Sequence, residues 1–340
     1  MRPRKSLLYI GNKLAVHGKN PTAIDRLPAK LEAEGYTVIT ASPKRNKLLR
    51  LWDMIITTIK NRKRVTMVLI DTYSTQNFYY AVIVASLCRL FTLPYIPVLH
   101  GGNLPIRLKR SKGLSDTLFG KAYINVAPSE YLLHQFREAG FHNIICIPNA
   151  IEIENYPFKT RPSITPKLLW VRSFSELYNP LLALQIVEML KMKGMDVSLC
   201  MVGPDKDGSL QRCKKIAAEL QLPITFTGML KKKEWIALSK DFDIFINTTN
   251  FDNMPLSVME AMALGMPVVS TNVGGLPFLI ENNVNGLLVP PNNPEAFVNA
   301  IEAICSNDVK ARELAKNARL KTEGFDWEKV KQRWIKLLND

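Results

Sequence analysis

The chain has 340 residues, with 45 Lys and Arg against 30 Asp and Glu, and its formal net charge is +15. This length is long for one hydrophobic core and suits two domains. No segment approaches the roughly 20 consecutive apolar residues of a membrane span, and the five cysteines are odd in number, without a C-x-x-C pair. These features argue against a membrane-spanning or disulfide-stabilised protein, and we expect reduced thiols and a cytoplasmic location.

Strands and helices are predicted to alternate along residues 1–158. The apolar run from Leu7 to Ile10 is too short for a signal peptide and predicts a first strand. The other elements expected here are helix 22–34, strand 37–41, a helix within 44–64, strand 65–71, helix 79–91 and strands 95–99, 123–127 and 144–147. This alternation is typical of a doubly wound α/β domain.

Positive charge is concentrated in this first half, which carries 22 Lys and Arg against 10 Asp and Glu in residues 1–158. In segment 44–64 an apolar helical face is flanked by cations: the face is Leu48, Leu51, Trp52, Ile55, Ile56 and Ile59, and the cations are Lys44, Arg45, Lys47, Arg50, Lys60, Arg62, Lys63 and Arg64. A basic amphipathic helix can lie on an anionic membrane surface. The alternative is that the apolar face packs on the domain's own sheet.

A second basic run, Arg107, Lys109, Arg110 and Lys112, favours the membrane interpretation. Charge alone also suggests a nucleic-acid partner. The first domain contains no helix-turn-helix, zinc-finger or aromatic sheet motif, and we therefore expect no nucleic acid.

His100 is a candidate ligand-binding residue because it follows the predicted strand 95–99 and precedes two glycines. Side chains at the carboxyl end of a parallel strand point into the ligand crevice of such a domain. A lone histidine is more often structural. Gly11 and Gly18 border the loop after the first strand, although a glycine in that place is more often only part of a turn.

A domain boundary is predicted near the proline-rich segment 155–166, giving domains 1–158 and 159–322 and a terminal helix within 323–340. The elements expected in the second half are strands 167–171, 198–203, 224–228, 243–246, 267–270 and 286–289, with helices that include 294–305, 309–321 and 327–338. Asp205 and Asp207 form an Asp-x-Asp pair beside glycine and proline, where they are better explained as turn formers than as metal ligands.

The stretch 247–275, NTTNFDNMPLSVMEAMALGMPVVSTNVGG, lies between two predicted strands and contains a helix predicted from Pro255 to Leu264. The start of such a helix attracts anions. Asp252 and Glu260 are eight positions apart, about two helical turns, and carboxylates of this kind accept hydrogen bonds from sugar diols. The alternative is a cap-region acid at Asp252 and a solvated Glu260.

This stretch resembles the donor-site motif of glycosyltransferase family 4, whose members are retaining enzymes with two Glu residues separated by seven others. AMALGMPVVSTNVGG matches closely, Glu260 matches the second Glu, and Asp252 replaces the first. The resemblance implies an α/β GT-B fold, with two Rossmann-like doubly wound domains facing a central cleft. It covers nearly the whole chain and is sharpest between residues 243 and 291.

The resemblance also implies roles for single residues. Glu260 would hold the nucleotide ribose, Asp252 and His100 would lie near the transferred sugar, and Arg172 would neutralise the donor diphosphate. Further donor contacts would come from Gly11, Gly18, Asn253, Met254, Pro255 and Leu256, although Pro255 has no N–H to offer. Position 178 is Tyr where the family usually has a Lys.

The function expected from the resemblance is retaining transfer of a hexose from a nucleotide-diphosphate sugar, with a UDP-sugar as the expected donor, without a metal or cofactor. The acceptor would be a glycan or lipid-linked glycan of surface polysaccharide synthesis, at the inner face of the membrane. Because Asp252 and Tyr178 depart from the family pattern, the alternative is a non-catalytic protein with a degenerate GT-B site that binds sugar nucleotides or membranes.

Overall fold

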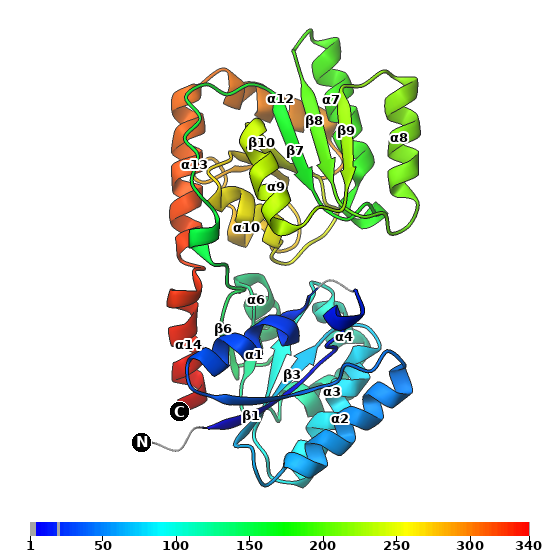
Figure 1. Cartoon of the computed structure of the whole chain (residues 1–340), viewed down its shortest axis with the longest axis vertical. Helices are drawn as coiled ribbons and strands as arrows, with labels where there is room; N and C mark the ends of the chain where they lie inside the picture. Colours follow the sequence, from blue (N-terminus) through cyan, green and yellow to red (C-terminus); the bar gives the residue numbers. More distant parts are fainter. Residues whose placement is uncertain (1–4, 19–20, 340) are drawn as a thin grey trace. The chain divides into compact units, whose positions relative to one another are not determined.

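The computed structural model describes residues 5–18 and 21–339. The chain divides into two compact units, Met1–Pro148 with Lys336–Asp340, and Asn149–Ile335. Each unit is built on a parallel six-stranded sheet flanked by helices (Figure 1). All five cysteines are free thiols. Among the described residues, no helix combines the length and the apolar character needed to cross a bilayer.

The first unit has the strand order β2-β1-β3-β4-β5-β6. Its strands are β1 (Ser6–Ile10), β2 (Thr37–Ala41), β3 (Met67–Thr72), β4 (Tyr95–Leu99), β5 (Asn125–Ala127) and β6 (Ile144–Cys146). The chain moves from β1 outward to β2 and then returns to β3 on the other side, which makes the β1/β3 edge a topological switch point. Ligands of open α/β sheets bind outside the carboxyl ends of such strands, here just beyond Ile10 and Thr72.

Helices cover both faces of this sheet, and the central strands are consequently buried, with Leu7, Leu8 and Val68 inaccessible to solvent. The helices are α1 (Ala23–Ala33), α2 (Lys47–Asn61), α3 (Asn77–Leu90), α4 (Leu104–Arg110), α5 (Lys112–Phe119) and α6 (Glu130–Glu138). The predicted elements are present with ends shifted by a few residues. The helices α4 and α5 were not predicted, and the second basic run lies on them.

Helix α2 differs from its prediction in the face that it buries. Arg50, Met54 and Thr58 are the buried residues of this helix, whereas Leu48 is 71% exposed and Trp52 61% exposed. The expectation that Arg50 contributes to a basic surface is wrong. Its guanidinium donates to the carbonyl oxygens of Lys44 and Arg45, the turn that leads into the helix. The sheet-packing alternative fails for the exposed part of the apolar face.

The second unit has the strand order β12-β11-β10-β7-β8-β9. Its strands are β7 (Lys167–Val171), β8 (Ser198–Val202), β9 (Ile224–Gly228), β10 (Ile244–Asn247), β11 (Val268–Thr271) and β12 (Leu287–Val289). The chain starts at β7, builds β8 and β9 to one side, and then crosses to β10 on the other side. The switch point of this unit is therefore the β7/β10 edge, beyond Val171 and Asn247.

The helices of the second unit are α7 (Pro180–Met192), α8 (Ser209–Glu219), α9 (Lys232–Leu238), α10 (Leu256–Ala263), α11 (Leu276–Leu279), α12 (Pro294–Cys305), α13 (Asp308–Glu323) and most of α14 (Trp327–Asn339). The loop between β8 and α8 contains Asp205 and Asp207. Their carboxylates accept the backbone N–H groups of Gly208 and Ser209, as expected of turn formers.

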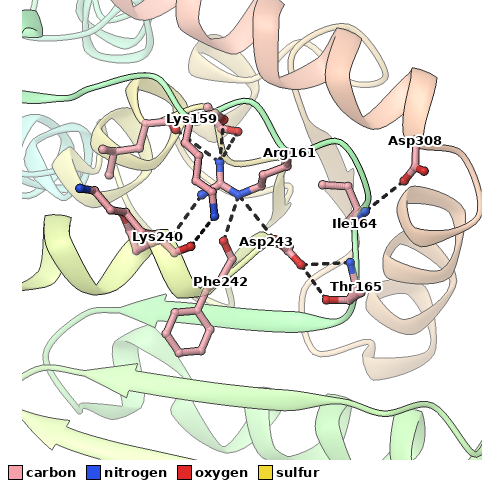
Figure 2. A network of polar contacts seen from close by, with 11 residues as sticks. Lys159, Arg161, Ile164, Thr165, Lys240, Phe242, Asp243 and Asp308 are labelled. Atoms are coloured by element: carbon pink, nitrogen blue, oxygen red, sulfur yellow. Dashed lines mark hydrogen bonds and ion pairs between the residues drawn. The ribbon is translucent and has the colours of Figure 1, made fainter.

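Residues 149–166 belong to the second unit, although the proline-rich segment 155–166 was interpreted as a domain boundary. Arg161 is 3% exposed, and Figure 2 shows its guanidinium among backbone carbonyls. It donates to the carbonyl oxygens of Lys159, Ser239, Phe242 and Gly265 at 2.8–3.2 Å. Asp243, 3.8 Å from Arg161, also accepts from the Thr165 hydroxyl at 2.6 Å. The boundary between the two compact units lies after Pro148, ten residues before the predicted boundary at residue 158.

We expect Arg161→Leu to lower the free energy of unfolding by about 3 kcal/mol, because several buried carbonyls would lose their donor together. Chemical denaturation measures this change. Arg312→Leu is the matched control, since exposed Arg312 donates to one carbonyl, that of Pro162, and should cost less than about 1 kcal/mol. Equal losses in the two variants would contradict a structural role for the Arg161 network.

Candidate functional site

The predicted donor-site residues gather at the switch point of the second unit. Arg172 directly follows β7, and the loop 248–255 connects β10 to α10. The sequence places both segments at the carboxyl ends of adjacent parallel strands, which is where such sheets bind ligands.

Two glycines in the loop after β11 pack against the loop before α10. A Cβ on Gly275 would lie 1.8 Å from the Asn253 carbonyl oxygen, and one on Gly274 would lie 2.1 Å from that of Asp252. Gly274 also has φ +54°, in the left-handed region that favours glycine. The Gly275 N–H donates to the Asp252 carbonyl at 2.9 Å. The Gly-Gly pair at the end of the motif thus lets the two loops pack backbone to backbone.

Helix α10 begins at Leu256, one residue later than predicted, with Pro255 as its N-cap in an extended conformation. No described side chain caps this helix start. The first N–H groups of an α-helix have no partner within the helix, so that of Leu256 is available to a ligand. Asp252 does not cap the helix, because its Oδ1 accepts the N–H of the adjacent Asn253 at 2.7 Å.

Glu260 lies in the middle of α10 and is only 5% exposed, so the alternative of a solvated helix residue is wrong. Its Oε1 accepts the Tyr156 hydroxyl at 2.8 Å and forms an ion pair with Lys232 Nζ at 2.6 Å. The Lys232 ammonium also lies 5.5 Å from the centre of the Tyr156 ring. A buried carboxylate needs such partners to offset the loss of water.

Arg172 forms an ion pair with the Asp252 carboxylate, and its guanidinium lies over the Tyr178 ring, 4.5 Å from the centroid. Its Nε has no hydrogen-bond partner among the described residues. Burial lowers the pKa of Arg172, while the Tyr178 and Glu260 side chains act in the opposite direction. The Asp252 carboxylate is the direct partner of Arg172. We call Arg172, Lys232, Asp252 and Glu260 the acid–cation cluster.

The prediction from sequence missed Lys232 and Tyr156. Lys232 is the first residue of α9, within the run Lys231, Lys232 and Lys233, and this run was the only available signal. Cations are disfavoured at the start of a helix, because the macrodipole is positive there. Three lysines at that position are a local departure of the kind expected near a functional site.

In the first unit His100 belongs to a second polar cluster, beyond the carboxyl end of β4. Its Nε2 lies 2.7 Å from Asp71 Oδ1, which also accepts the Tyr9 hydroxyl at 2.8 Å. The imidazole stacks on Tyr73 with 4.8 Å between ring centroids. Burial, followed by the Asp71 charge, raises the pKa of Tyr9, which keeps this hydroxyl a donor. A carboxylate oxygen only accepts hydrogen bonds, so the geometry favours a proton on Nε2 of His100, and in that tautomer Nδ1 is the acceptor.

Gly11 and Gly18 occupy different environments. A Cβ on Gly11 would meet Asp71 Oδ2 at 2.5 Å, so glycine at this position makes room for the carboxylate beside His100. Gly18 is exposed, with φ +75° at the end of a short 3₁₀ helix, and a Cβ there would meet nothing within 4 Å. The turn geometry accounts for Gly18, whereas packing accounts for Gly11.

We expect ¹⁵N-edited spectra of the histidine rings to show the Nε2–H tautomer for His100, a tractable measurement because the chain has four histidines. Asp71→Ala should mix the two tautomers, because it removes the acceptor. Tyr9→Phe is the matched control, since it removes the other donor to the same Asp71 oxygen and leaves the His100 contact. A wild-type spectrum with the proton on Nδ1 would contradict this arrangement.

Comparison with known proteins identifies the family. Residues 152–321 match the model for glycosyl transferases group 1. The chain is 27% identical, over 67% of its length, to the amylovoran biosynthesis glycosyltransferase AmsK of Erwinia amylovora. It is 24% identical, over 57% of its length, to the Escherichia coli UDP-Gal:alpha-D-GlcNAc-diphosphoundecaprenol alpha-1,3-galactosyltransferase. The matches span 60% and 54% of those relatives' own lengths.

Solved structures agree in fold. The sucrose-phosphate synthase of Thermosynechococcus elongatus superposes with a TM-score of 0.80 at 18% identity, covering 99% of this chain and 98% of that one. Anabaena HepE in complex with UDP superposes with a TM-score of 0.77 at 17% identity, covering 99% and 100%. The chain belongs to the glycosyl transferases group 1 family, and its two Rossmann-like units form a GT-B fold.

Proposed function

We propose that the protein is a retaining glycosyltransferase that moves a hexose from a UDP-sugar to an acceptor hydroxyl without a metal ion. The observation that carries this proposal is the buried Glu260 carboxylate of the acid–cation cluster, beside the uncapped start of α10. A buried acid, an arginine and free helix N–H groups at a switch point suit a ligand that has both diol and phosphate groups.

In this proposal each part of the cluster meets one part of the donor. Glu260 accepts the ribose hydroxyls, and Arg172 with the N–H of Leu256 receives the diphosphate. The N–H of Met254 serves the phosphate and the sugar hydroxyls, whereas the N–H of Asn253 is held by Asp252. Negative charge develops on the leaving diphosphate in the transition state, and preorganised donors lower that barrier without a metal.

The remaining candidate residues complete the proposed roles. Asp252 contacts the transferred sugar. His100, in the first unit, keeps its predicted role of contacting substrate. Gly11 acts by leaving room for Asp71. The donor binds the second unit, and the basic first unit takes the acceptor. Gly18 has no structural feature that supports donor binding beyond its turn.

The names of the relatives support the proposed substrate classes. One relative is named for transfer of galactose from UDP-Gal to a diphosphoundecaprenol-linked sugar, and HepE has been solved with UDP-glucose. AmsK and the Escherichia coli protein WcaL are named for polysaccharide biosynthesis. We infer a lipid-linked glycan acceptor in surface polysaccharide synthesis for this chain.

Helix α2 supports a peripheral location on the cytoplasmic face of a membrane. Leu48, Trp52 and Ile56 are spaced by four residues on one face and are 71%, 61% and 43% exposed. Exposed cations stand at both ends of the helix: Lys44, Arg45 and Lys47 at the start, and Lys60, Lys63 and Arg64 at the end. An apolar stripe between cations fits an anionic lipid surface. Lys109, Arg110 and Lys112 of the second run are exposed too.

We expect Glu260→Gln to abolish the rise in melting temperature that UDP produces in the wild type, and to reduce sugar transfer at least about 100-fold. Glu302→Gln is the matched control, because Glu302 forms an exposed ion pair with Lys193 at 2.8 Å in the same unit. Unchanged UDP binding in Glu260→Gln would remove the ribose assignment.

A panel of nucleotide sugars with lipid-linked acceptors tests the reaction itself. Acceptor-dependent release of nucleoside diphosphate, with the donor's anomeric configuration kept in the product, supports a retaining transferase. Donor binding without turnover would favour the non-catalytic alternative.

We expect the double change Leu48→Ser and Trp52→Ser to weaken binding to phosphatidylglycerol-containing vesicles roughly tenfold or more in co-sedimentation, because both apolar anchors are lost. Lys63→Ser with Arg64→Ser should act only on the anionic vesicles. Met192→Ser, at a residue 81% exposed in the second unit, serves as the control. Vesicle binding that none of these variants changes would end the membrane proposal.

A further inference from the structure

Lys232 is the least expected member of the acid–cation cluster. It comes from α9, a separate element from the motif that contains Asp252 and Glu260. The Lys232 side chain is 46% exposed and the Glu260 side chain is 7% exposed, so the ammonium stands at the rim of the site above a buried carboxylate. The ion pair of 2.6 Å joins the rim to the interior of the site.

The lysines at the start of α9 do not stabilise that helix. The N-terminal N–H of Lys231 is satisfied by the Glu234 carboxylate at 2.7 Å, and each added cation there opposes the macrodipole. Lys231, Lys232 and Lys233 are all exposed, so none of them fills a core position. This run of cations destabilises its own helix and borders the candidate ligand site. Such a run suits the binding of an anionic ligand from outside the protein.

Within the described residues, the cluster holds two cations and two carboxylates, so its formal charges cancel in the free protein. Arg172 is already paired with Asp252, and its face is covered by Tyr178. A diphosphate that relied on Arg172 alone would face this competition. Lys232 is the cation with a long, flexible and half-exposed side chain, able to leave its carboxylate when a stronger anion enters.

We propose that Lys232 binds the diphosphate of the donor nucleotide and exchanges Glu260 for phosphate when the donor enters. The inference rests on the proposed role of Glu260 at the ribose, because the α-phosphate is attached to that same ribose. When the ribose hydroxyls donate hydrogen bonds to the Glu260 carboxylate, the Lys232 ammonium is released and forms an ion pair with the adjacent phosphate. The buried carboxylate thus has a partner in both states, and the site gains a second cation for the leaving group.

Titration calorimetry with nucleosides and their diphosphates separates a phosphate contact from a ribose contact. UDP, GDP and ADP are compared with uridine, guanosine and adenosine on the full chain. For the diphosphate that binds the wild type, Lys232→Met should weaken affinity roughly 10-fold to 100-fold, the worth of one charge-assisted hydrogen bond. The affinity for the matching nucleoside should change less than about twofold, because it has no phosphate.

Lys233→Met is the control, since it removes a neighbouring exposed cation from the same helix turn. Lys232→Arg should retain most of the diphosphate affinity. If Lys232→Met weakened nucleoside and diphosphate binding equally, Lys232 would act only through Glu260, and the proposal would be overturned. An unchanged diphosphate affinity in Lys232→Met would overturn it as well. A wild type that binds no nucleoside diphosphate would instead reject the proposed function, and this inference with it.

Discussion

The burial of one carboxylate constrains the whole second unit. Helix α10 is buried from Ser257 to Ala263, and Glu260 is the charged residue within that span. A charge removed from water costs several kcal/mol unless partners surround it. Those partners come from different parts of the fold: Tyr156 from the segment after the first unit, and Lys232 from α9. The segments that contain Tyr156, Lys232 and Glu260 are distant in sequence, and they meet at this carboxylate to form the site.

The far ends of the same helices are fixed by a second cation. Arg161 donates to carbonyls after α9, at Ser239, and after α10, at Gly265. Carbonyls at a helix C-terminus lack intrahelical partners and carry partial negative charge, so a buried guanidinium satisfies them efficiently. In Figure 2, Lys159, Arg161, Ile164 and Thr165 lie within this network of polar contacts. Lys232 and Glu260 are thus placed by a pair of helices whose opposite ends are tied to one residue, which favours a rigid, preorganised cluster.

Much of the fold was predictable because parallel strands are short buried apolar runs, and the strands β2, β4, β7 and β9 have the predicted bounds. The acids of the motif were also found, since their spacing is local. The partners of Glu260 were not, because Tyr156 lies 104 residues away in sequence and no periodicity links them. Similarly, the apolar period of α2 could not reveal that Arg50 would be buried to serve backbone carbonyls. Local pattern specifies elements, whereas polar contacts depend on the assembled tertiary structure.

The two departures from the family pattern, Asp252 and Tyr178, meet at one guanidinium. Tyr178 covers the face of Arg172, and Asp252 pairs with the edge. The short aspartate side chain also accepts the N–H of its own neighbour, Asn253, a local contact typical of aspartate in loops. Asp252 therefore ties Arg172 to the loop before α10, and a longer glutamate would reach past that N–H. Because Arg172 is held on both sides, this part of the site keeps its geometry without a ligand. The charged group that can still move is the Lys232 ammonium at the start of α9.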